Sequence, residues 1–192
     1  MLERVFPYPY ARLDDVRAEM ERAARRFSAR PGTLPLNAAL NAHNSIVHRF
    51  ADAVGCTFTQ LHAEVAEEWP PGEGEFGLLF DGWLCKPLSR SHPTRDLDLR
   101  FSVRRGRFAN SDDGLVATVD YLYLPTKLQR RGLGFCLLEA LAVVWAQMGL
   151  PEVHADFAPG NGQARAAFAK WGFLPRHQED ARLLGLYRTL PF

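Results

Sequence analysis

The stretch from Val119 to Met148, VDYLYLPTKLQRRGLGFCLLEALAVVWAQM, decides the fold. A β-prone run leads into a basic turn with two glycines, and an apolar helix follows the turn. The N–H groups that open a helix favour an anion, as does the helix dipole, and Gly132 and Gly134 let the backbone approach such a ligand. The stretch therefore predicts a phosphate site, although an ordinary strand–turn–helix with solvated arginines has the same local pattern.

The helix after the turn is apolar almost all round, which indicates that it packs on several sides. We expect it to end at Gly149–Pro151 and to lead into a strand over Glu152–Phe157. A right-handed crossover would join this strand to the one before the helix if the two run parallel. A turn at Ala158–Gly162 then opens a further helix, which ends at Gly172. The last predicted strands are Phe173–Pro175 and Arg182–Leu190.

Three helices are predicted ahead of the sheet. Apolar side chains recur at helical spacing over Leu13–Phe27 and Asn37–Val54. Thr57–Gln60 fits a capping box, which would open a third helix that reaches Trp69. The run Pro70–Gly74 then breaks the helical pattern and separates it from an extended region. The strands predicted in that region are Phe76–Leu84, Leu97–Val103 and Leu115–Leu124.

Length and composition indicate one globular domain. The chain has 192 residues, of which 47% are hydrophobic and 23% charged. We predict a single domain over residues 1–192, with a helical N-terminal elaboration at 1–75 and the sheet core at 76–192. The net charge of +1 gives no reason to expect a nucleic acid or a membrane as partner.

The cysteines and histidines give no framework of disulfides or metal ligands. Three scattered cysteines and an N-terminus without an apolar signal core lead us to expect a cytoplasmic protein with reduced thiols. His43 and His48 share a predicted helix, but they are five residues apart, which is poor spacing for a shared ligand face. We therefore expect no metal site.

Two segments resemble the signature of the GNAT acyltransferase superfamily. Gln129–Gly134 (QRRGLG) matches its Q/R-x-x-G-x-G/A turn, and Asn161–Phe173 is similar to its N-x-x-A-x-x-(L/F)-Y-x-K-x-G-F segment. The resemblance runs from Leu97 to Phe192 in order and spacing. It implies a mixed α/β fold with a splayed central sheet and helices on both faces, preceded by a helical N-terminal segment, rather than a Rossmann-like nucleotide binder.

The resemblance also implies the ligand, an acyl-coenzyme A, with acetyl-CoA as the default donor. The pantetheine arm would lie where the two central strands diverge, pairing with the backbone of Tyr123 and Leu124. Asn161 would contact the same arm, or else only cap its helix. The residues of the turn that would bind the pyrophosphate are Gln129, Arg130, Arg131, Gly132, Leu133 and Gly134. The two arginines could instead serve an acidic acyl carrier protein.

One departure from the signature affects the chemistry. The family usually has a tyrosine whose hydroxyl protonates the departing thiolate, but this chain has Phe168, which has no proton to give. Three explanations stay open. The thiolate leaves without an acid, because a thiol with a pKa of about 8.5 is a fair leaving group. Alternatively, Tyr121, Tyr123 or Tyr187 replaces the missing group, or the protein binds acyl-CoA without transferring anything.

Direct transfer also needs a base, because an ammonium group must lose a proton before it attacks. Asp120 alternates with Leu122 and Leu124 on its predicted strand, which would place it among apolar residues and raise its pKa. Asp156 is the second acidic candidate. Either carboxylate could instead pair with an arginine, and water could carry the proton away.

We therefore predict an acyl-CoA-dependent N-acyltransferase that acts by direct attack of an amine on the thioester. The candidate catalytic residues are Asp120, Tyr123 and Tyr187. The alternative from another class is a non-catalytic acyl-CoA sensor on the same fold. The acceptor would be a small-molecule or peptide amine, bound by residues 1–75 and the loop Lys86–Thr94. No nucleic-acid or membrane partner is expected, and a homodimer stays open.

Overall fold

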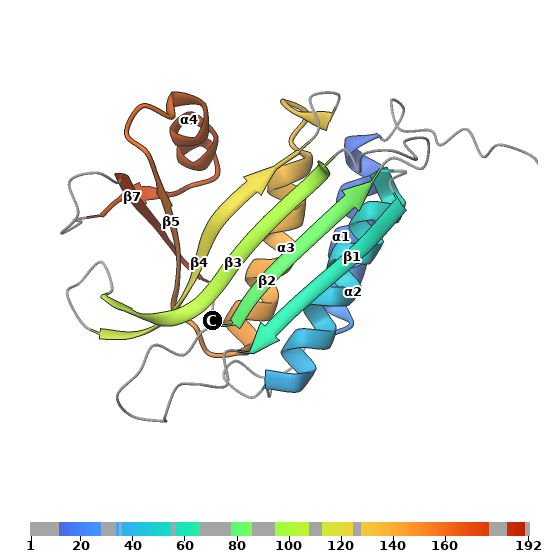
Figure 1. The fold of residues 1–192 in the computed structure, drawn as a ribbon, viewed down its shortest axis with the longest axis horizontal. Helices are drawn as coiled ribbons and strands as arrows, with labels where there is room; N and C mark the ends of the chain where they lie inside the picture. The colour runs from blue at the N-terminus through green and yellow to red at the C-terminus, as the bar shows by residue number, and fades with distance from the viewer. Residues whose placement is uncertain are drawn as a thin grey trace, which may run out of the picture.

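A mixed sheet forms the centre of the molecule (Figure 1). The computed structural model describes residues 12–27, 34, 36–54, 57–65, 78–85, 95–107, 113–124, 128–176 and 184–190. Within these residues the sheet has seven strands, in the order β1-β2-β3-β4-β5-β7-β6. The strands are β1 (Thr57–Val65), β2 (Leu78–Cys85), β3 (Arg95–Arg107), β4 (Asp113–Tyr123), β5 (Glu152–Phe157), β6 (Leu174–Pro175) and β7 (Leu184–Thr189). The helices are α1 (Leu13–Arg25), α2 (Leu36–Val54), α3 (Leu133–Gln147) and α4 (Gly162–Lys170).

The centre of the sheet is the parallel pair of β4 and β5, and the other neighbours in the described sheet run antiparallel. Helix α3 connects β4 to β5, since parallel neighbours need a crossover. The predicted mixed α/β fold with a helical N-terminal segment is confirmed, and β5 has the predicted bounds.

The third predicted helix is wrong. Thr57–Val65 forms strand β1, which pairs antiparallel with β2 from Thr57 opposite Cys85 to Val65 opposite Leu78. The capping-box pattern is local, whereas pairing with β2 satisfies the backbone over the whole segment, and the β-branched and aromatic residues at its start suit a strand. Two helices therefore precede the sheet, and residues 66–77 lie outside the described residues.

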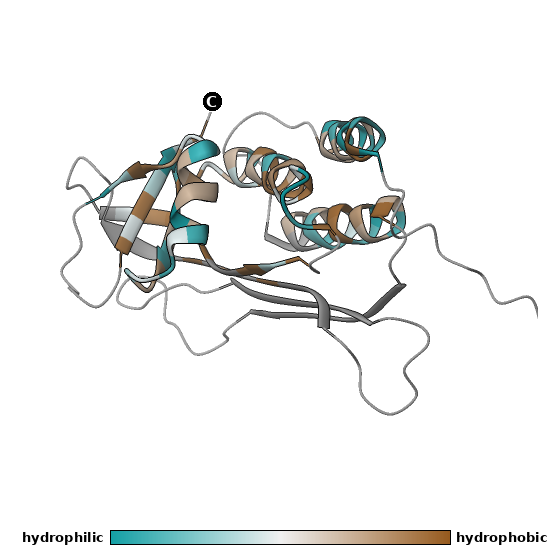
Figure 2. Cartoon of the chain, turned by 90° about the horizontal axis from the view of Figure 1, so that it is seen from above, coloured by the Kyte–Doolittle hydropathy of each residue, from teal (hydrophilic) through white to brown (hydrophobic). Residues whose placement is uncertain are grey.

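Helices α1, α2 and α3 share one face of strands β1 to β4 (Figure 2). Phe101 of β3 packs against two of these helices, and its ring centroid lies 4.8 Å from that of His43 on α2 and 5.3 Å from that of Trp145 on α3. Helix α3 is buried along most of its length, as its apolar sequence predicts. We expected helices on both faces. The fourth, α4, follows β5 and stacks Phe168 on Phe157 of that strand.

None of the described helices combines the length and the hydropathy that a membrane crossing requires.

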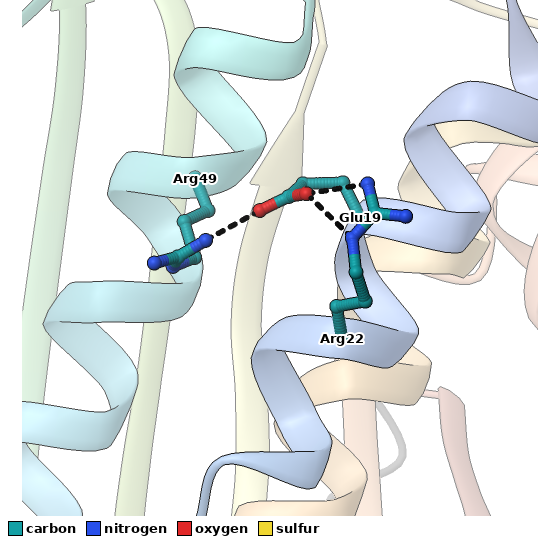
Figure 3. Close-up of polar contacts among 3 residues, drawn as sticks. All are labelled: Glu19, Arg22 and Arg49. Atoms are coloured by element: carbon teal, nitrogen blue, oxygen red, sulfur yellow. Dashed lines mark hydrogen bonds and ion pairs between the residues drawn. The ribbon is translucent and has the colours of Figure 1, made fainter.

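An ion-pair cluster links α1 to α2 (Figure 3). The Glu19 carboxylate accepts hydrogen bonds from Arg22 at 2.7 and 3.1 Å and from Arg49 of α2 at 2.6 Å. Arg22 contributes most to holding the pKa of Glu19 below its ordinary value, and Arg49 adds to it. The Glu19 side chain is only 21% exposed, so its ion pairs are less screened by solvent than those at an open surface.

Glu19→Gln should lower the free energy of unfolding by about 1 kcal/mol, because the two guanidinium groups lose the carboxylate charge and keep only a neutral amide acceptor. Urea unfolding at pH 7 measures the change. Glu21→Gln is the matched control, since Glu21 lies on the same helix with a side chain 55% exposed and 3.5 Å from Arg25. Equal losses in the two variants would contradict a stabilising role for the Glu19 cluster.

Candidate functional site

The turn between β4 and α3 has the backbone of an anion site. Arg130 and Gly132 have positive φ values of 57° and 78°, and Gly132 is the N-cap of α3. In the described part of the chain, no side chain caps this helix. Its first N–H groups therefore lack the side-chain acceptor that many helices supply, and an anion can take that place. Arg130 is exposed beside them and Arg131 is half-buried.

Gln129 fixes the turn to the end of the central strand. Its Nε2 donates a hydrogen bond of 2.7 Å to the backbone carbonyl of Leu124, the residue after β4. Leu128 anchors the same turn in the core with 1% of its surface exposed. The side chain of Gln129 thus has a structural role, and one lone pair of the Leu124 carbonyl is already used.

The second glycine of the signature has a packing role. A Cβ atom on Gly134 would lie 3.1 Å from Cδ1 of Leu124 and 3.5 Å from the ring of Trp171. Its absence lets α3 lie close against β4 and the end of α4. The side chain of Leu13, at the start of α1, lies 3.4 Å from where a Cβ on Gly132 would be. Helix α1 therefore begins beside the turn.

Strands β4 and β5 diverge next to this turn. Their register contains three pairs, from Ala117 opposite Val153 to Val119 opposite Ala155. Strand β4 then continues to Tyr123 without a partner in β5. This is the splay that the resemblance implies, and within the described residues it leaves one backbone edge of β4 without a strand partner, where a ligand can pair.

A bulge lies where the splay begins. The register with β3 passes from Val119 opposite Phe101 to Tyr121 opposite Arg100, so Asp120 is the extra residue. Its alternation with Leu122 is therefore interrupted, and the argument that placed Asp120 among apolar residues does not hold. The side chain of Asp120 lies outside the described residues, as does that of Tyr121.

The other two candidate catalytic residues are not brought together. Tyr123 is 37% exposed at the end of β4. Tyr187 is half-buried on β7, opposite His154, which in turn is opposite Thr118 of β4. The register therefore separates the two tyrosines by roughly 15 Å along the strands, at 3.3 Å per residue.

Asn161 and Asp156 each have a structural partner. The Oδ1 of Asn161 accepts a hydrogen bond of 3.1 Å from the N–H of Ala164 at the start of α4, which is the capping role that we considered. The carboxylate of Asp156 accepts one of 2.8 Å from Arg176, and both side chains are largely buried. Arginine pairing, one of the alternatives for the acidic candidates, is thus observed for Asp156.

Phe168 belongs to an aromatic cluster of the core. It is 8% exposed, and its ring centroid lies 4.9 Å from Phe173, 5.1 Å from Trp171 and 5.9 Å from Phe157. The residue that replaces the usual tyrosine therefore contributes packing.

Phe168→Tyr should give no large gain in turnover and should cost about 1–2 kcal/mol of stability, because a hydroxyl would be buried among apolar rings. Thiol release from acetyl-CoA and urea unfolding measure the two effects. Phe135→Tyr, at a half-buried position of α3, is the control. A tenfold gain in turnover would show instead that the new hydroxyl reaches the leaving sulfur.

Strand β5 also carries a buried hydrogen-bonded pair that the motifs do not reveal. Nε2 of His154 lies 2.9 Å from Oε2 of Glu152, and the two side chains are 2% and 11% exposed. The signal that could have revealed it is the alternation of Glu152, His154 and Asp156, which places three ionisable residues on one face of a strand.

No protein-family model and no curated protein sequence matches the chain. Solved structures do. SsHAT is 25% identical over 40% of this chain and 37% of its own, with a TM-score of 0.36. A Klebsiella pneumoniae protein provisionally named an acyl-CoA N-acyltransferase is 13% identical over 82% of this chain and 94% of its own, with a TM-score of 0.43. A GNAT-family acetyltransferase of Staphylococcus aureus is 10% identical over 60% and 68%, with a TM-score of 0.42.

All three TM-scores lie below 0.5. The signature turn opens α3, the parallel strands β4 and β5 splay beside it, and α4 and β7 follow in the expected order. These features agree with the fold that the resemblance of the two segments to the GNAT superfamily implies.

Proposed function

We propose that this protein is an acyl-CoA-dependent N-acyltransferase, with acetyl-CoA as the default donor. One observation carries the proposal: the uncapped start of α3 lies beside the splay of β4 and β5, and Gln129 ties the two together. The first feature suits a pyrophosphate, and the second suits the amide-containing arm that follows it in coenzyme A.

The donor would be held mainly by backbone. Amides of Leu133 and Gly134 would bind the pyrophosphate, with Arg130 and Arg131 adding charge. The pantetheine arm would pair with the open edge of β4 up to Leu124, as an added strand does. Such an arrangement orients the thioester without requiring any particular side chain at the reacting carbon.

The reaction would be direct transfer. The amine nitrogen attacks the thioester carbonyl, the C–N bond forms, the C–S bond breaks, and the sulfur leaves as a thiolate. The nitrogen gives up one proton to water or to this thiolate, which leaves a neutral amide. Because a thiolate is a fair leaving group, a core phenylalanine at position 168 is compatible with turnover. The acceptor would be a small-molecule or peptide amine. Helices α1 and α2 would form a single domain together with the sheet.

Isothermal titration with acetyl-CoA, followed by thiol release over a panel of amines, tests the proposal. We expect binding and acceptor-dependent thiol release. Binding without release over the whole panel would favour the sensor function, and absence of binding would overturn both. Competition between acetyl-CoA and an acyl carrier protein distinguishes the two kinds of donor.

A further inference from the structure

One face of β5 carries a row of ionisable side chains. Strand alternation places Glu152, His154 and Asp156 on that face. Val153 and Ala155 point the other way, toward the core that β4 shares with helices α2 and α3. The row therefore lies on the face of β5 turned away from α3.

The Glu152–His154 pair has the geometry of an oriented imidazole. The carboxylate of Glu152 accepts a hydrogen bond and so favours the proton on Nε2, 2.9 Å away. This tautomer leaves Nδ1 as the nitrogen that can take a proton. Burying such a pair in a sheet costs desolvation energy, which makes it a weak device for stability alone.

Burial favours the neutral form of His154, and the charged groups around it leave the row negatively charged. Burial is the main cause that lowers the pKa of His154, and Arg176 acts in the same direction against Glu152 and Asp156. The other groups that face it in register are Thr118 of β4 and Tyr187 of β7. Two carboxylates, one guanidinium and a neutral imidazole sum to a charge of about −1, which favours a cation.

The row leads into the splay. His154 is opposite Thr118, one step before the last pair of β4 and β5, and Asp156 lies one residue beyond that pair. The row therefore extends from the buried pair to the place where the two strands separate.

We infer that His154 is the base that deprotonates a cationic amine acceptor in this gap, with Glu152 as the residue that positions its ring. The inference rests on the proposed function. In the step, the ammonium N–H proton moves to Nδ1 of His154 and the freed lone pair forms the C–N bond. The C–S bond breaks with its electron pair on sulfur, and the nitrogen gives its second proton to this thiolate, which leaves as the free thiol. Glu152 stabilises the imidazolium until its proton passes to water.

The test uses His154→Gln and Glu152→Gln in the full chain, with acetyl-CoA, spermidine and a lysine-containing peptide as probes, and with water as the nucleophile when no amine is added. We expect kcat/KM of His154→Gln at pH 7 to fall about 100-fold, the usual size of a general-base effect. The deficit should shrink as the pH approaches 10, because the free amine then no longer needs a base. Glu152→Gln should lose about tenfold and shift the pH profile.

Donor affinity and folding provide the controls. Acetyl-CoA affinity should be unchanged in both variants, and circular dichroism should show them folded. His43→Leu is the matched control, since it removes another buried histidine, on α2. This variant should keep the wild-type pH profile of kcat/KM. A deficit in His154→Gln that is equal at every pH, or no deficit, would overturn the inference and leave the proposed function intact. Wild-type protein that binds acetyl-CoA but releases no thiol to any probe or to water would also overturn it, and wild-type protein that does not bind acetyl-CoA would overturn both.

Discussion

Gly132→Glu will abolish acetyl-CoA binding and leave the sheet folded. Gly132 has a φ of 78° at the N-cap of α3, where any other L-residue costs about 1 kcal/mol. The glutamate would also put a negative charge and bulk where the N–H groups attract an anion, with the Leu13 side chain 3.4 Å from its Cβ. Isothermal titration should show a loss of at least about 100-fold, which corresponds to roughly 3 kcal/mol of binding energy.

Two control variants separate the causes. Gly172→Glu imposes the same backbone strain at a φ of 84°, and nothing lies within 4 Å of its added Cβ, so donor affinity should be kept. Gly132→Ala adds the strain at the turn without the charge and should lose affinity only moderately. If Gly132→Glu binds normally, or if Gly172→Glu loses as much, the pyrophosphate does not lie at this turn.

His43→Leu will make the protein less sensitive to acid. His43 is fully buried on α2 against Phe101, and burial lowers its pKa to about 4. In the unfolded chain the imidazole takes a proton near pH 6.5. Between pH 6.5 and 4 the unfolded state therefore binds more protons, so stability is fully present above pH 6.5 and falls as the pH falls. The complete effect is about 3 kcal/mol, of which about 2 kcal/mol appears between pH 7 and pH 5.

Urea unfolding at pH 7 and pH 5 measures this effect. The wild type should lose about 2 kcal/mol more than His43→Leu over that interval. His48→Leu, at an exposed position of the same helix, should keep the pH dependence of the wild type. The pKa of the buried His154 is also lowered, so the variant will retain part of its acid sensitivity. A parallel pH dependence in His43→Leu and the wild type would refute the burial argument.

Local sequence patterns predicted the elements that local physics determines. The glycines, the apolar run and the stop signals of α3 lie within the helix or next to it, and β5 has the predicted bounds. The helix predicted over Thr57–Val65 is wrong because the capping-box pattern is local. The strand partner that competes with it lies about 20 residues further along the chain, outside any local window.

The backbone of the turn in the candidate site could be predicted from the sequence. The features that depend on strand alignment and burial could not. Two residues of the signature turn, Arg130 and Gly132, have left-handed backbone next to the start of α3, where we propose that the anion binds. The bulge at Asp120 depends on how β4 aligns with β3. Alternation places Glu152 and His154 on one face of β5, but the burial of that face depends on what covers the strand. Neither alignment nor depth is encoded in the spacing of residues along one strand.

The two glycines of the turn differ in how freely they can change during evolution. At position 132 the obstacle is the positive φ of the backbone, so another residue stays strained there even if its neighbours move. At position 134 the obstacle is Cδ1 of Leu124, 3.1 Å from the added Cβ and at the tip of a side chain that can rotate. A lineage could therefore acquire alanine at 134 through one compensating change at 124, which agrees with a signature that allows alanine at its last position and not at position 132.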